Sequence, residues 1–214
     1  MVSWVIARST WWSLLFASAV ATLMVLFRLG YTGARPYYWL VLPNLVLAWI
    51  PLLLALLLRR LQRPVAQIAV GAAWLLFLPN APYILTDFVH LTWVPALITV
   101  HYDIAMIGAV AVLALYLGFL AMALVQDLVA GRFGGRVGWL FACAGWGLVS
   151  LGVYLGRIPR FNSWDIVRVP WRIVEAALFI PRGEIPMVVG FTLALIALYL
   201  PFWSMLRGGR SQGT

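Results

Sequence analysis

Residues 77–91 read FLPNAPYILTDFVHL and lie where an uninterrupted apolar segment would be expected to end. Pro79 and Pro82 have no backbone N–H, and each disfavours helix in the residue before it. Asn80 is a residue type that caps helix N-termini, and Pro82 would then fall in the first turn, where proline is tolerated. The stretch therefore predicts a break between two helical pieces, with Asn80 capping the second.

The composition around this stretch is typical of an integral membrane protein. Of the 214 residues, 64% are hydrophobic and 10% are charged, against roughly 25% charged residues in soluble domains. All fifteen basic residues are arginine and the formal net charge is +9. The arginines lie mostly at the ends of apolar runs, where they anchor to lipid headgroups. No basic patch is interleaved with aromatic residues, so we expect no nucleic acid as a partner.

Six apolar windows reach or approach the roughly 20 residues that a membrane-spanning helix needs. We expect an all-α integral membrane fold, with one helical membrane domain over residues 1–214 and interfacial helices in the loops after spans three and five. A barrel is excluded because no segment alternates between apolar and polar residues as barrel strands do. The windows are approximately 10–29, 39–58, 64–78, 104–126, 138–155 and 187–206.

The arginines also bear on orientation. The positive-inside rule favours an orientation with both termini in the cytoplasm, once the five arginines of the last loop are discounted. The other side then also holds Arg28 and Arg35. In either orientation, the loops after spans three and five lie on the same membrane face, so the polar residues of the two loops can meet.

The second helical piece carries its polar residues on one side. At about 100° per residue, Tyr83, Thr86, Asp87 and His90 share a face. The apolar residues of the other side are Ile84, Leu85, Phe88, Val89 and Leu91. This pattern predicts an amphipathic helix at the membrane edge or facing a polar cavity.

Ionisable residues gather between this piece and span four, where the run HYDI adds His101 and Asp103. Ionisable groups at membrane depth are costly and by default indicate function. Asp87, His90, His101 and Asp103 could together be ligands of a divalent metal. Alternatively, one histidine activated by a carboxylate could act as a catalytic acid or base. A structural role in satisfying helix ends and interfacial hydrogen bonds also remains open.

A second polar run, GRIPRFNSWD, covers residues 156–165 directly after span five. Asn162 or Ser163 is expected to cap a short helix that has Asp165 in its first turn. Pro170 would end that helix, and RIVEAALFI at 172–180 would form a second interfacial one.

The chemistry of this run indicates an anion site. Arg157 and Arg160 could hold a lipid phosphate or a carboxylate, because guanidinium groups suit such anions. They could instead pair with Asp87 or Asp103, or anchor to headgroups. We expect the substrate-binding residues to be Tyr83, Arg157, Arg160, Asn162, Trp164 and Asp165. Asn44, in span two, either packs there, bonds across helices or joins the site.

The strings P-N-x-P-Y-x-x-T-D-x-x-H-L at 79–91, YDI at 102–104 and LGRIPRFNSWDI at 155–166 resemble the DUF1361 family of uncharacterised bacterial multi-pass membrane proteins. The likeness runs from about span two to span six. The resemblance implies an all-α multi-pass fold and a place in the bacterial inner membrane, but it implies no activity. The shared core that it implies is Pro79, Asn80, Pro82, Tyr83, Thr86, Asp87, His90, Tyr102, Asp103, Arg157, Arg160, Asn162, Ser163, Trp164 and Asp165. Ile158-Pro159 departs from the pattern.

Three functions follow as hypotheses. The first is a membrane enzyme or lipid-binding protein that acts on an anionic lipid or envelope intermediate through a polar pocket on the non-cytoplasmic face. The second is a small transporter or channel that uses the broken third helix. The third is a non-catalytic accessory subunit of a membrane complex. The sequence leaves open whether the protein is an enzyme, which cofactor it would use and how it oligomerises.

Overall fold

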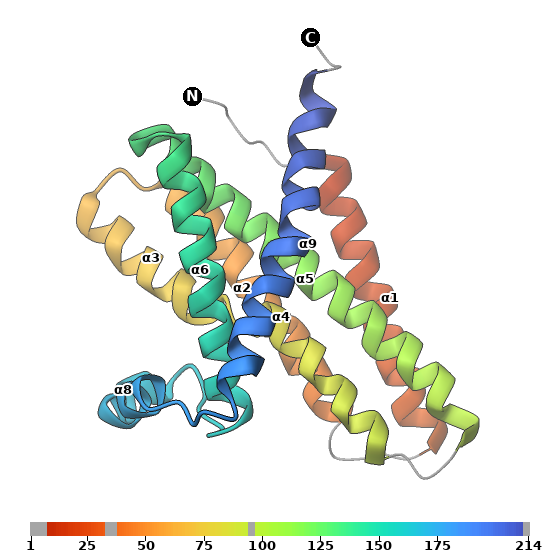
Figure 1. Ribbon diagram of the computed structural model, residues 1–214. Coiled ribbons are helices and arrows are strands. Elements are labelled where there is room, and N and C mark those ends of the chain that lie inside the picture. The colour runs from red at the N-terminus through yellow and green to blue at the C-terminus, as the bar shows by residue number, and fades with distance from the viewer. Residues whose placement is uncertain (1–7, 33–37, 94–96, 212–214) are drawn as a thin grey trace.

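The computed structural model describes residues 8–32, 38–93 and 97–211, which form helices and no strand (Figure 1). Arg35, which entered the orientation argument, lies outside these ranges. The helices are α1 (Arg8–Thr32), α2 (Tyr38–Arg60), α3 (Pro64–Phe77), α4 (Asn80–Tyr83), the 3₁₀ helix η1 (Ile84–Trp93), α5 (Leu97–Phe133), α6 (Gly135–Arg157), α7 (Asp165–Arg168), α8 (Pro170–Leu178) and α9 (Ile185–Ser211).

Within these ranges, six segments are long and apolar enough to cross a membrane, so the chain is a multi-pass membrane protein. They are Arg8–Tyr31, Val41–Arg60, Pro64–Val89, Val100–Phe133, Gly135–Arg157 and Ile185–Gly208. This confirms the predicted all-α membrane fold. The third span is longer than the predicted window of 64–78, because α4 and η1 continue the path of α3 beyond the break.

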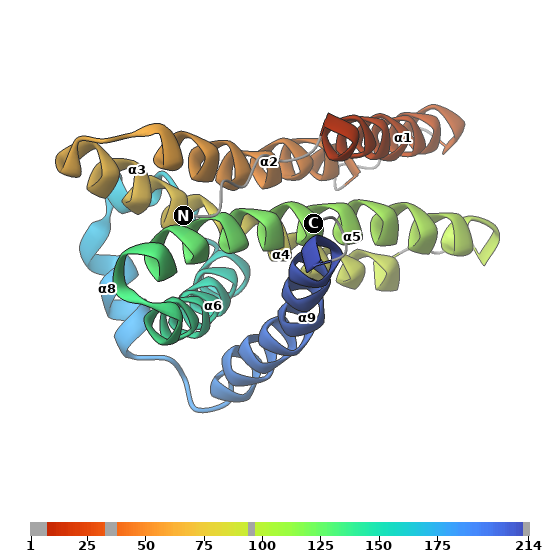
Figure 2. The same ribbon diagram turned by 90° about the horizontal axis from the view of Figure 1, so that it is seen from above.

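The helices form three layers, and α5 belongs to the middle one. Seen from above, α1, α2 and α3 lie on one side of α5, while α6 and α9 lie on the other (Figure 2). Helix α5 contacts α1, α2, α4, α6, α9 and η1. The start of α1 and the end of α9 lie at one end of the bundle, and α8 lies across the opposite end (Figure 1).

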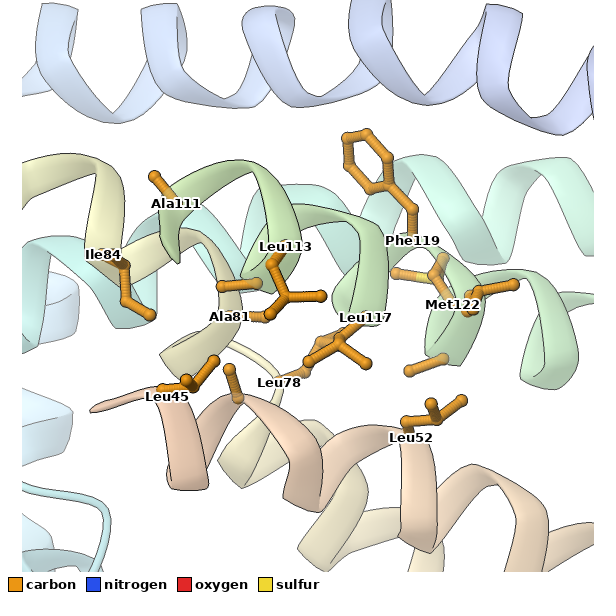
Figure 3. Packing of buried hydrophobic residues seen from close by; sticks show 14 of the residues in the cluster. Leu45, Leu52, Leu78, Ala81, Ile84, Ala111, Leu113, Leu117, Phe119 and Met122 are labelled. Atoms are coloured by element: carbon orange, nitrogen blue, oxygen red, sulfur yellow. The ribbon is translucent and has the colours of Figure 1, made fainter. Parts of the chain in front are cut away.

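The core packs closely where α4 meets α5. Leu78 and Ala81 of the break are fully buried, and they lie against Leu117 of α5 and its neighbours (Figure 3). A Cβ atom on Gly118 would lie 2.8 Å from the Cβ of Ala81, so only glycine permits this approach. Such contacts matter in a membrane, because lipid removes most of the hydrophobic drive and leaves helix association to packing and hydrogen bonds.

The break after α3 is present, but its hydrogen bonding differs from the prediction. Asn80 was expected to be the N-cap of the second piece; this is wrong, since Pro79 precedes the first residue of α4 and no side chain caps it. Instead, Asn80 Nδ2 donates to the carbonyl of Phe77 at 2.8 Å. In a continuous α-helix the Ala81 N–H would bond to Phe77 O, but here it bonds to Leu78 O at 3.2 Å. The side chain of Asn80 therefore satisfies the Phe77 carbonyl, which has lost its α-helical donor.

The restart after the break is a 3₁₀ helix, whereas the expected face was calculated for an α-helix. Its side chains do not present the polar face expected from α-helical geometry as one set. Val89 turns out to line a cavity together with Tyr83 and Asp87. Thr86 does not line it, and its Oγ1 donates back to Tyr83 O at 2.7 Å.

The two short helices after α6 match the predicted interfacial segments. Helix α7 ends before Pro170, which opens α8. On α8, Trp171, Val174 and Leu178 are exposed, and the exposed Arg168 and Arg172 lie nearby in the chain. A short helix with exposed apolar and basic residues, lying across the ends of the spans, suits the headgroup region.

Candidate functional site

The two polar runs meet in one cavity of about 770 Å³, within the usual range for ligand sites. Helices α2, α3, α4, η1, α6, α7 and α8, together with the segment between α6 and α7, form its walls. The polar or aromatic lining residues are Asn44, Asn80, Tyr83, Asp87, Arg157, Arg160, Phe161, Asn162, Ser163 and Trp164. The apolar ones include Leu47, Ala72, Leu75, Leu76, Leu148, Leu151, Leu155, Ile166 and Ile173.

Asp87 is the buried acid of the cavity, with 3% of its surface exposed. Asn44 Nδ2 donates to Asp87 Oδ2 at 3.2 Å, which links α2 to η1. Arg157 Nη1 lies 3.9 Å from Asp87 Oδ1. Asn44 therefore both bonds across helices and joins the cavity wall. Arg157 lies at ion-pair distance from Asp87, which was one of the two partners considered as an alternative to an anion.

The guanidinium groups of Arg157 and Arg160 have N–H donors that no described residue accepts. Arg157 ends α6, its side chain is 22% exposed, and it makes no hydrogen bond with any described residue. Arg160 lies in the following turn and has no carboxylate within ion-pair distance in the described part of the chain. Its backbone has φ 62°, the single positive value among the described non-glycine residues. Such backbone is uncommon for a residue with a side chain and often marks functional sites.

The segment from 161 to 165 is held by its own side chains. Asp165 Oδ2 accepts from the Asn162 backbone N–H at 2.7 Å and from Asn162 Nδ2 at 3.4 Å. The expectation that Asn162 or Ser163 caps α7 is wrong, since Trp164 occupies the N-cap and bears no capping hydrogen bond. Asp165 does open α7, as predicted. Asp165 holds the loop in place through these bonds, while Asn162 and Trp164 line the cavity.

A direct contact joins the two runs. Asn80 Nδ2 lies 3.4 Å from Ser163 Oγ, so the break after α3 touches the segment after α6. Two glycines of α6 permit this proximity. A Cβ on Gly152 would lie 2.5 Å from Pro79 Cγ, and one on Gly156 would lie 3.1 Å from Tyr83 Cε2.

Gly152 and Gly156 were not identified from the sequence as residues of the site, although their spacing could have indicated them. The run GVYLG at 152–156 has small residues four positions apart, the spacing that lets membrane helices approach closely. The spacing indicates a close contact but does not name the partner. Only the fold shows that the partner is the Pro-Asn break.

The structure separates Asp103 from the cavity. Arg28 of α1 holds it with two hydrogen bonds, Nε to Oδ1 and Nη2 to Oδ2, the latter at 3.1 Å. Both side chains are buried, and the neighbouring Tyr102 OH donates to Met24 O at 2.8 Å. His101 is exposed. Neither His101 nor Asp103 lines the cavity, so Asp103 joins α5 to α1 instead.

The predicted set of four metal ligands is therefore not brought together in the described part of the structure. No three His, Cys, Asp or Glu residues in that part could hold a metal ion. The side chain of His90 lies outside what the structure describes. Of the ten predicted site residues, those that line the cavity are Tyr83, Asp87, Arg157, Arg160, Asn162 and Trp164.

Comparison with known proteins gives a family and no activity. The family model described as "Protein of unknown function (DUF1361)" matches residues 43–205, which include every residue that lines the cavity. No curated protein and no solved structure matches the chain.

Proposed function

Because the chain belongs to the DUF1361 family, whose description names no activity, we propose a function from the site itself. The protein binds the anionic group of a membrane lipid or envelope intermediate between Arg157 and Arg160. The observation that carries this proposal is that two guanidinium groups line one cavity without a hydrogen-bond acceptor from the described residues. Guanidinium donors match the oxygens of phosphate and carboxylate groups.

The charge balance of the cavity supports the same ligand. Asp87 can neutralise one of the two arginines, and it is the one carboxylate among the described residues that line the cavity. One positive charge remains near the membrane, where an unmatched charge is costly. An anionic headgroup would neutralise it and would satisfy both side chains.

The adjacent groups extend the proposal to enzyme chemistry. Asp87 and Tyr83 line the same cavity as the arginines, so a carboxylate and a phenol stand within the site that would hold the anion. A buried carboxylate beside a bound headgroup can take up or release a proton in a reaction at that headgroup. The protein is then a membrane enzyme; without such a reaction it is a lipid-binding protein.

We also propose an orientation. Both termini face the cytoplasm of a bacterial inner membrane, and the cavity opens on the opposite face. The basic residues Arg59, Arg60, Arg63, Arg132 and Arg136 lie at the α2–α3 and α5–α6 connections, at the end of the bundle where α1 begins and α9 ends (Figure 1). This agrees with the positive-inside rule once the arginines that follow α6 are discounted.

The test is lipid mass spectrometry on full-length protein purified in mild detergent and then incubated in phosphatidylcholine nanodiscs doped with phosphatidic acid. Wild-type protein should retain phosphatidic acid, and the Arg157→Gln/Arg160→Gln double variant should lose it. Arg168→Gln is the matched control, since Arg168 is exposed in the same loop and does not line the cavity. Equal retention by the double variant and the wild type would overturn the proposal.

A transporter is the second candidate, because the broken third span lines the cavity with Pro79 and Asn80. Discontinuous helices often carry substrate sites in transporters. Solute or ion movement by the reconstituted protein, abolished by Asp87→Ala, would favour this function. An accessory subunit would instead tolerate Asp87→Ala wherever the variant remains folded and inserted.

A further inference from the structure

We propose that the ligand carries a hydrocarbon chain, which lies in the apolar arm of the cavity between α3 and α6 and enters it sideways from the bilayer. The inference rests on the proposed function and adds the class of ligand. The site would then take an anionic amphiphile from within the membrane, and a water-soluble anion would fill only its polar end.

The apolar arm is a defined part of the cavity. Its residues are Leu47 of α2, Ala72, Leu75 and Leu76 of α3, and Leu148, Leu151 and Leu155 of α6. The arm follows α3 from Ala72 to Pro79, roughly 10 Å at 1.5 Å per residue. The arginines stand at the end of α6, beyond Leu155 in the chain, so the cavity has a charged end and an apolar end.

The arm opens to the side of the bundle. Ala72 is exposed and Leu148 is 49% exposed, although both line the cavity. Both lie inside segments that cross the membrane, Pro64–Val89 and Gly135–Arg157. An opening at this depth would face hydrocarbon, so a chain would pass between the bilayer and the arm without crossing water.

The polar end of the cavity is held in a fixed position relative to the apolar arm. The contact of Gly152 with Pro79 fixes α6 against the end of α3, directly beside the lining residues Leu151 and Leu155. An amphiphile with its headgroup on the arginines would thus have its chain directed along α3 and α6. This continuity with the anion site distinguishes the arm from an ordinary lipid-facing surface.

Physical chemistry limits what the arm can contribute. A chain gains little free energy on moving from lipid into a protein groove, because both surroundings are apolar. The headgroup then supplies most of the affinity, and the arm acts by shape. Blocking the arm should weaken binding of chain-bearing ligands and leave the polar end unchanged.

The experiment narrows the arm by placing larger side chains at two exposed positions that line it. Ala72→Trp and Leu148→Trp add bulk to lining residues. Their matched controls are Ile68→Trp and Leu140→Trp, on the same helices, at exposed positions that do not line the cavity. Titration of each full-length variant in phosphatidylcholine nanodiscs with inorganic phosphate and with hexadecyl phosphate gives two affinities per variant.

We expect the arm variants to lose about ten-fold or more in affinity for hexadecyl phosphate, since overpacking a filled groove is costly. Affinity for inorganic phosphate should stay unchanged, and the controls should match the wild type for both probes. Equal hexadecyl phosphate affinity in the arm variants and controls would overturn the inference. So would a change of oligomeric state in the arm variants with unchanged binding, because the arm would then be a contact between copies.

The Arg157→Gln/Arg160→Gln variant separates this inference from the proposed function. If that variant binds both probes like the wild type, the anion site itself is refuted. If it loses both probes while Ala72→Trp loses neither, the anion site stands and the chain-binding arm does not.

Discussion

Asp87 Oδ1 and Arg157 Nη1 lie 3.9 Å apart, joining the restart of the broken third span to the end of α6. The distance allows an ion pair but is too long for a hydrogen bond. The carboxylate therefore stands beside the guanidinium without occupying its donors. A ligand anion on Arg157 would share the cavity with this negative charge.

Asp87→Asn should strengthen anion binding. The substitution removes a negative charge close to the proposed ligand position, and charge pairs at such distances interact by several kcal/mol in partly buried sites. We expect the affinity for phosphatidic acid in nanodiscs to rise by roughly ten-fold. Weaker binding would show that Asp87 serves mainly to position Arg157. If the protein is an enzyme, turnover should fall while binding rises.

Asn44→Leu should destabilise the protein. Asn44 donates to a buried carboxylate, and hydrogen bonds to charged groups contribute about 1.5–3 kcal/mol. Thermal unfolding in detergent should show a lower midpoint than the wild type. In the Asn44→Leu/Asp87→Leu double variant most of this loss should be recovered, because the buried carboxylate that Asn44 serves is removed with it. Equal loss in both variants would contradict this account.

Gly152→Ala should loosen the contact between α6 and the break after α3. Its Cβ would lie 2.5 Å from Pro79 Cγ, so the helices must shift, at a cost of about 1–3 kcal/mol. Gly147→Ala is the control on the same helix, because nothing lies within 4 Å of the added Cβ. Thermal midpoints measured side by side test the difference, and equal midpoints would refute the tight contact.

The Arg28–Asp103 pair should be structural. Breaking it with Arg28→Met alone removes the guanidinium that pairs with a buried carboxylate and should cost about 3–5 kcal/mol. Arg28→Met/Asp103→Leu should recover most of this stability. Phosphatidic acid binding by the double variant should equal that of the wild type, since neither residue lines the cavity. Lost binding in a stable double variant would place Asp103 in the function.

Cysteine labelling tests the orientation. In a Cys143→Ser background, Arg160→Cys reports on the cavity end and Arg136→Cys on the end that carries the termini; both positions are exposed. A membrane-impermeant maleimide applied to intact spheroplasts should label position 160 and spare position 136. The reverse pattern would place the cavity in the cytoplasm. Labelling of both in lysed cells confirms that each cysteine is reactive.

The sequence by itself determined the class of fold and the two polar runs that line the cavity. Apolar runs of spanning length predict helices locally, and Pro79 and Pro82 remove backbone donors wherever the chain is placed. The two polar runs share a face because an even number of spans separates them, whatever the orientation of the chain. These features follow from each residue's own chemistry and its position along the chain.

Tertiary structure decided which polar groups meet. Asp87 and Asp103 look alike in the sequence, yet Asp87 lines the cavity with Arg157, while Asp103 is bound by Arg28. The outcome depends on how each helix is rotated and crossed, which close contacts such as Gly152 on Pro79 help to set. The predicted polar face of η1 was altered as well, because the apolar Val89 lines the cavity and Thr86 does not. Pairing across helices is a property of packing, and no single segment of the sequence contains it.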